Sequence, residues 1–145
     1  MKSLCVDTNV LLSIASEYAY PPCPAAQALS AAIASGCRIA ISAQSLYEFW
    51  SVATRPPASN GFGWDIEKTR ETLDALCWKF ALLEEKPEVV GIWLDLVTRF
   101  RLKGKRIHDA HLLATIKANG VPTLLTLNPR DFPDGSGIEI VTPAE

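Results

Sequence analysis

Short apolar runs alternate with helical patterns along the whole chain, and this alternation constrains the fold more than any other feature of the sequence. The apolar runs occupy residues 4–6, 39–41, 80–83, 124–127 and 138–141. The patterns between them have helical spacing and occupy residues 8–15, 24–36, 42–55, 65–78, 87–102 and 108–119. Strands that alternate with helices form parallel sheets covered on both faces. We therefore predict an α/β fold, a three-layer α/β/α sandwich with a mostly parallel central sheet.

Length and composition limit the classes of protein that this fold can serve. The 145 residues suit one domain, and 48% hydrophobic with 21% charged residues is ordinary for a globular chain. The net charge of −2 excludes a generally basic surface, so any contact with nucleic acid must come from a local patch. We find no targeting segment and no membrane-spanning run, and we expect a cytoplasmic protein with reduced cysteines.

In parallel sheets, ligands bind beyond the carboxyl ends of the strands. Asp7, Ser42 and Asn128 each follow a predicted strand and should lie at this edge. Asp7 can be read in two ways, as the cap of the following helix or as a carboxylate that points into a cleft. Asn128 and Asp131 belong to an Asn-Pro turn that could bring either side chain to the same edge.

Two further carboxylates lie within predicted helices. Asp109 begins an apolar stripe and should face the sheet, where an unpaired charge needs a partner. That partner could be the amides of the first helical turn or a divalent cation. Glu48 lies opposite an apolar stripe, so it faces either solvent or a cleft.

Histidines and basic residues surround Asp109. His108 and His111 match no helical zinc motif, and His108 is more simply a neighbour of the helix start or an RNA contact. Five basic residues fall within eight positions, with no acid between them. This basic run forms either a solvated helix end or a phosphate-binding patch. The run consists of Arg99, Arg101, Lys103, Lys105 and Arg106.

Four motifs in the same order resemble those of PIN-domain ribonucleases, and most closely those of VapC-type toxins of bacterial toxin–antitoxin pairs. The resemblance covers essentially the full chain, which would be a single PIN-like nuclease domain over residues 1–145. The motifs are VDTNV at 6–10, LYEFW at 46–50, HDAHLLA at 108–114, and LLTLN at 124–128 followed by Asp131 and Phe132.

The resemblance implies cleavage of RNA that depends on Mg²⁺ or Mn²⁺, with Asp7, Glu48 and Asp109 as the acidic cluster. A fourth acidic residue usually follows the last core strand in this family. Asn128 stands there in this chain, and Asp131 is the nearest acid, so either could complete the catalytic group. Hard oxygen ligands suit Mg²⁺ or Mn²⁺ independently of the resemblance.

Each of the remaining site residues has an expected role. Asp7 and Asp109 would bind the metal directly, whereas Glu48 would bind through water or orient the attacking water. Side chains that hydrogen-bond these ligands would come from Thr8, Asn9, Thr126 and Asn128. RNA would contact Lys103, Lys105, Arg106 and His108.

The expected partners are an RNA substrate and a cognate antitoxin. Four tryptophans and the apolar content also suggest a homodimer. Two alternatives stay open: a PIN-fold nuclease of RNA processing outside any toxin–antitoxin system, and an inactive PIN-fold module that binds RNA or protein.

Overall fold

The computed structural model describes residues 2–16 and 24–143 of the chain. Its centre is a sheet of five strands in the order β3-β2-β1-β4-β5, and every neighbouring pair is parallel. The predicted mostly parallel sheet is therefore parallel throughout. The strands are β1 (Ser3–Val6), β2 (Arg38–Ile41), β3 (Ala81–Leu82), β4 (Thr123–Leu125) and β5 (Glu139–Val141).

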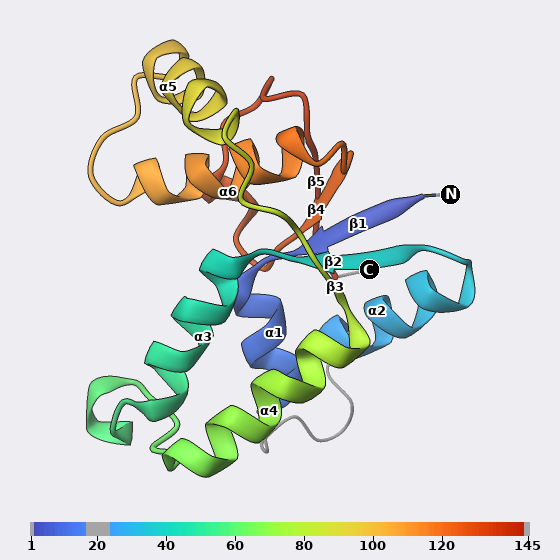
Figure 1. Cartoon of the computed structure of the whole chain (residues 1–145), viewed down its shortest axis with the longest axis vertical. Coiled ribbons are helices and arrows are strands. Elements are labelled where there is room, and N and C mark those ends of the chain that lie inside the picture. Colours follow the sequence, from blue (N-terminus) through green and yellow to red (C-terminus); the bar gives the residue numbers. More distant parts are fainter. Residues whose placement is uncertain (1, 17–23, 144–145) are drawn as a thin grey trace.

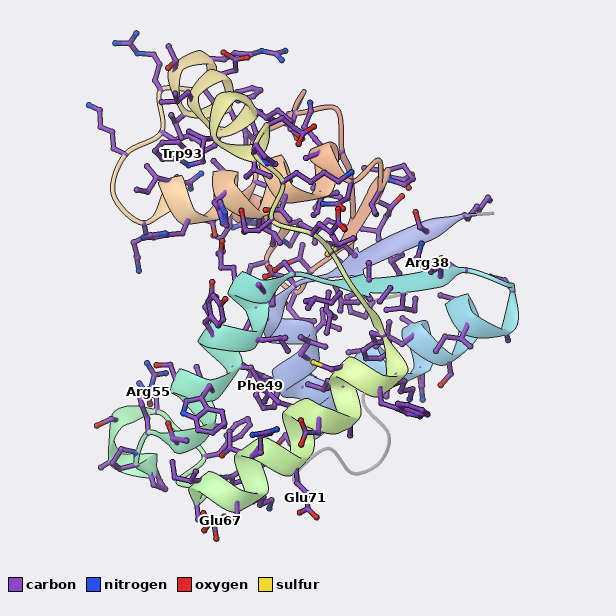
Figure 2. The ribbon with its side chains drawn as sticks, viewed as in Figure 1. Arg38, Phe49, Arg55, Glu67, Glu71 and Trp93 are labelled. Atoms are coloured by element: carbon purple, nitrogen blue, oxygen red, sulfur yellow. The ribbon has the colours of Figure 1, made fainter. Side chains whose placement is uncertain are left out.

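Helices cover both faces of this sheet and complete the predicted three-layer sandwich (Figure 1). One face carries α1 (Thr8–Ala15), α2 (Pro24–Ala34), α3 (Ala43–Thr54) and α4 (Ile66–Lys79), and the other carries α5 (Val89–Arg99) and α6 (Arg106–Ala118). Each face has its own apolar cluster: Phe49 and Leu11 belong to the first, and Leu113 and Ile116 to the second. Figure 2 shows Phe49 between α3 and α4, while Glu67 and Glu71 point away from the body of the protein.

The helices begin where the sequence supplies caps. The carboxylate of Asp7 accepts a hydrogen bond from the Thr8 amide, the Ser42 hydroxyl accepts from the Ser45 amide, and Asp65 caps α4. Because β1 and β2 run straight into capped helices, the amino ends of α1 and α3 lie at the carboxyl edge of the sheet. Helix α6 runs antiparallel to the strands, so its amino end lies at this edge too (Figure 1).

Several predicted boundaries were wrong. Strand β4 ends at Leu125, not at residue 127, because the chain turns away after the Thr126 amide bonds to the Val141 carbonyl. Thr126 rather than Asn128 therefore follows the strand. Helix α6 begins at Arg106 instead of His108, and α5 and β3 are shorter than expected.

Residues 55–63 form a loop that contains a 3₁₀ turn at Pro57–Ser59. Gly61 is required there, since a β-carbon at this position would lie 2.1 Å from the Arg55 carbonyl oxygen. Helix α4 turns Leu76 inward and leaves Cys77 exposed. None of the helices in the described ranges is long and apolar enough to cross a membrane.

Candidate active site at the carboxyl edge of the sheet

Asp7 caps helix α1, as one of its two readings predicted, and it also lies near other carboxylates. One carboxylate oxygen accepts the Thr8 amide at 2.7 Å, and the other accepts the Thr126 hydroxyl at 2.8 Å. The pKa of Asp7 is raised, mainly by burial and further by the charges of Glu48 and Asp131. The two hydrogen bonds lower this pKa but do not cancel the rise. Asp7 is thus a half-buried carboxylate near other carboxylates.

Thr126 and Asn9 hold this part of the site together. The Thr126 hydroxyl accepts hydrogen bonds from the Asn9 side-chain amide at 3.3 Å and from the Asn128 backbone amide at 3.1 Å. The Asn9 side-chain oxygen accepts the Leu127 amide at 3.1 Å. These bonds join the start of α1 to the segment after β4 and fix the position of Asp7.

Glu48 faces a cleft, which decides between its two readings. Its neighbours Leu46 and Phe49 are buried on the opposite side of α3, whereas Glu48 is exposed. The Thr8 hydroxyl donates to one Glu48 carboxylate oxygen at 3.1 Å, and the Gln44 side-chain amide donates to the other at 2.7 Å. The carboxylate is therefore held in one orientation from both sides.

Asp109 lies in the first turn of α6 and is half-buried. Within the described residues its carboxylate makes no hydrogen bond or ion pair, so the first-turn amides do not satisfy it. Burial is the largest cause of an Asp109 pKa of about 6, followed by the charges of Asp131, Asp7 and Glu48, while Arg106 acts in the opposite direction. A carboxylate with this environment needs either a proton or a cation.

Asp131 and Asn128 differ in what they bring to this edge. Asp131 lies in a 3₁₀ turn after β4, and its charge acts on both Asp7 and Asp109. Asn128 contributes its backbone amide to Thr126, and no side-chain contact of Asn128 is seen in the described region. Asp131 is therefore a fourth carboxylate at this edge, close enough to Asp7 and Asp109 to act on both.

A cleft of about 540 Å³ lies between α3 and α6. It is lined by Gln44, Tyr47, Glu48, Glu85, Lys105, His108, Asp109 and His111. A second depression of about 540 Å³ holds Asp131 and Asn128. The four carboxylates thus lie at one edge of the sheet, but they do not all open into the same cleft.

The basic run does not match a simple helix end. Arg99 ends α5, but Lys105 precedes α6 and Arg106 is its first residue. Cations are unfavourable at a helix amino end, so the helix dipole cannot explain these two. All five basic side chains are exposed, and in the described part of the chain none forms an ion pair.

No three or more histidine, cysteine, aspartate or glutamate side chains in the described ranges are arranged to hold a metal ion as they stand. The chemistry of the donors nevertheless suits a hard divalent cation, since carboxylate oxygens are hard ligands and the charges of three other carboxylates raise the pKa of Asp109. His111, considered for zinc, instead has its ring nitrogens against Gln44 and Glu85.

Sequence reasoning missed three residues of the cleft. Gln44 bonds to Glu48, to the His108 carbonyl and to His111, and Glu85 faces His111 from the segment after β3. Tyr47 was seen only as part of a motif, yet its side chain is 72% exposed beside the carboxylates. The signal for Gln44 and Tyr47 was their spacing from Glu48, which puts all three on one face of α3.

The family model of the PIN domain matches residues 4–136. The chain therefore belongs to the PIN domain family, as its motifs suggested. No curated protein matches the chain in sequence.

Solved structures with the same fold include VapBC complexes and a toxin–antitoxin complex. A toxin–antitoxin complex from Klebsiella pneumoniae contains a chain 26% identical to this one, with a TM-score of 0.65 and 98% of both chains covered. VapBC-1 from nontypeable Haemophilus influenzae matches with a TM-score of 0.74, 12% identity and 99% of both chains. VapBC2 from Rickettsia felis bound to a promoter DNA fragment matches with a TM-score of 0.69, 16% identity, and 97% of this chain against 98% of its own.

Proposed function

We propose that this chain is an endoribonuclease that depends on Mg²⁺ or Mn²⁺ and acts as the toxin of a toxin–antitoxin pair. The observation that carries the proposal is the group of four carboxylates at the carboxyl edge of a PIN-family sheet. Three of them, together with burial, raise the pKa of the fourth, Asp109, to about 6. Carboxylates that repel one another destabilise the folded protein, and a bound cation would relieve this repulsion.

Asp7 and Asp109 are the proposed direct metal ligands. Asp131, rather than Asn128, is the proposed fourth carboxylate, because its charge acts on both of them. A shared ion would offset the repulsion among these carboxylates. A bound divalent cation would activate water and stabilise the charge that develops on the phosphate.

Glu48 is the proposed group that orients the attacking water. Thr8 and Gln44 hold its two oxygens, so the carboxylate has a fixed direction at the wall of the cleft. Thr126 and Asn9 keep Asp7 in place in the same way. These residues position the carboxylates and need not contact the RNA.

The rim of the cleft suits a single-stranded RNA. Lys105 and His108 line the cleft beside Asp109, and Lys103 and Arg106 extend the positive charge next to it. Phosphates bind to such basic residues, whereas exposed aromatic rings stack on unpaired bases. The exposed ring of Tyr47 is placed to stack on a base near the cleaved bond.

The proposal of a toxin has a separate support. The similar solved structures include VapBC complexes and a toxin–antitoxin complex, of which one chain is 26% identical over 98% of this chain. We propose a cognate antitoxin as partner and a homodimer as the assembled form. An adjacent gene for a small DNA-binding protein, whose expression restores growth to cells that make this chain, would distinguish a toxin from an RNA-processing nuclease.

A cleavage assay tests the activity. The purified chain should cut a labelled single-stranded RNA internally in Mn²⁺ or Mg²⁺ but not in EDTA, and Asp7→Asn should abolish cutting. The control is Asp95→Asn, which changes an exposed carboxylate on α5 and should cut like the parent. RNA that the parent binds but leaves intact in both metals would refute a nuclease and support the binding module.

A further inference from the structure

The helices that carry Glu48 and Asp109 share no apolar core. Helix α3 packs into the cluster on one face of the sheet, through Leu46 and Phe49. Helix α6 packs into the cluster on the opposite face, through Leu112 and Leu113. The two helices meet only beyond the carboxyl edge of the sheet, so polar contacts must set the distance between their carboxylates.

Every hydrogen bond between α3 and α6 in the described ranges involves Gln44. Its side-chain nitrogen donates to the His108 carbonyl at 3.2 Å, and its side-chain oxygen accepts from Nδ1 of His111. The same nitrogen donates to Glu48 at 2.7 Å. One amide therefore joins the first turn of α6 to the carboxylate of α3.

His111 is itself held from its other side. Its Nε2 atom lies 3.1 Å from a carboxylate oxygen of Glu85, which belongs to the segment between β3 and α5. The ring therefore cannot turn away from Gln44 without losing a second partner. This gives a continuous series of contacts that runs from Glu85 through His111 and Gln44 to Glu48.

We propose that Gln44 is a positioning residue that fixes Glu48 relative to Asp109 and thereby sets the geometry of the metal site. The inference rests on the proposed function. Thr8 alone would leave one Glu48 oxygen free, and the carboxylate could then rotate toward solvent. Without Gln44 the first turn of α6, which holds Asp109, would lose its polar tie to α3.

The side chain must be both long and an amide. Asparagine is shorter by one methylene and would not span from α3 to α6, whereas glutamate could not donate to Glu48 and would place a like charge beside it. Methionine keeps the length and packing of glutamine but makes neither kind of hydrogen bond. Gln44→Met therefore removes the contacts with little change of shape.

The test compares Gln44→Ala and Gln44→Met with Gln27→Ala, which changes an exposed glutamine on α2, on the far side of the sheet from α6. Mn²⁺ affinity is measured from the free-ion signal in electron paramagnetic resonance. Gln44 contacts the first turn of α6, which carries the proposed ligand Asp109, and substitution of a residue that orients a metal ligand typically weakens affinity or activity by about 10–100-fold. We expect this loss in Mn²⁺ affinity and in kcat for both Gln44 variants, with little change in KM, and no change for Gln27→Ala.

Hydrogen exchange gives a second measurement that needs neither metal nor activity. In EDTA, amides in the first turn of α6 should exchange faster in both Gln44 variants, and amides of β1 should not. Faster exchange with unchanged Mn²⁺ affinity would reduce Gln44 to a structural tie and overturn the proposal. If both Gln44 variants behaved like the parent in all measurements, the proposal for Gln44 would be overturned, but the proposed nuclease activity would not be affected. A parent that neither binds Mn²⁺ nor cuts RNA would refute the proposed function and this inference together.

Discussion

Replacing Asp109 by asparagine removes one negative charge from the site with almost no change of shape. Raising the pKa of a carboxyl from 3.8 to about 6 corresponds to about 3 kcal/mol against the ionised form in the folded state. Asp109 is only half-buried, so solvent screening reduces this to about 1–2 kcal/mol. In a metal-free protein at pH 7, Asp109→Asn should increase the free energy of unfolding by this amount. The expected rise in Tm is about 3–6 °C.

The pH dependence follows from the same raised pKa. Between about pH 4 and pH 6 the native state binds a proton at Asp109 that the unfolded state has already released. The free energy of unfolding of the parent should therefore fall as pH rises through this range. The advantage of Asp109→Asn should be complete above pH 6 and vanish near pH 4.

Melting curves in EDTA and in Mn²⁺ separate this account from a structural one. Mn²⁺ at one hundred times its Kd should stabilise the parent by about 2.7 kcal/mol, and the variant much less. If the only role of Asp109 were its favourable interaction with the dipole of α6, its replacement would destabilise the protein by about 0.3–1 kcal/mol. Mn²⁺ would then stabilise the parent and the variant equally. Asp95→Asn controls for a general effect of charge. A destabilised Asp109→Asn variant that still cuts RNA would refute the metal role of Asp109.

Three further predictions concern the surface around the site. Changing Lys103, Lys105 and Arg106 together to alanine should weaken RNA binding and reduce the log–log salt slope by up to about 2; an unchanged slope would remove the basic run from the RNA contact. Tyr47→Ala should lose about 1–3 kcal/mol of RNA binding in EDTA while Tyr47→Phe keeps it, and equal loss in both would argue against stacking. Light scattering at micromolar concentration should give the mass of a dimer, and a monomer would contradict the proposed assembly.

The layers of the fold could be predicted because each strand and helix has a local signal. Apolar runs such as 39–41 predict buried strands. The helix starts are indicated by capping residues, namely Asp7, Ser42 and Asp65. The alternation of strands and helices predicted a mostly parallel sheet, but the strand order could not be predicted from these signals. The order depends on which strands neighbour one another in space, and no local pattern specifies that.

Helix and strand ends were predicted less well for a related reason. Sequence placed the start of α6 at His108 because the apolar spacing becomes visible there, but Arg106 already adopts helical structure without a capping side chain. Leu127 looked like strand because it is apolar, yet it is exposed after the chain has left the sheet. Tertiary contacts, not composition, decided both ends.

The acidic residues of the candidate site were predicted from sequence, and Thr8 and Thr126 hydrogen-bond them as expected, whereas Gln44 and Glu85 were missed. Asp7 and Asp109 stand out because they interrupt apolar patterns next to a strand end and a helix start. Glu85 carries no comparable signal, since an exposed glutamate is common on any surface, and the spacing of Gln44 from Glu48 gives its face of α3 but not its partners on α6. Only the approach of α3 to α6 across the sheet edge shows what these two contact.

The central claim is that carboxylates from separate segments bind one divalent cation. Anomalous diffraction from crystals soaked in Mn²⁺ tests this most directly. We predict a manganese peak at the carboxyl edge of the sheet, within bonding distance of Asp7 and Asp109, with Asp131 or Glu48 nearby and no peak in the Asp109→Asn variant. A fully soaked crystal with no peak there, or with a peak that persists in the variant, would contradict the account.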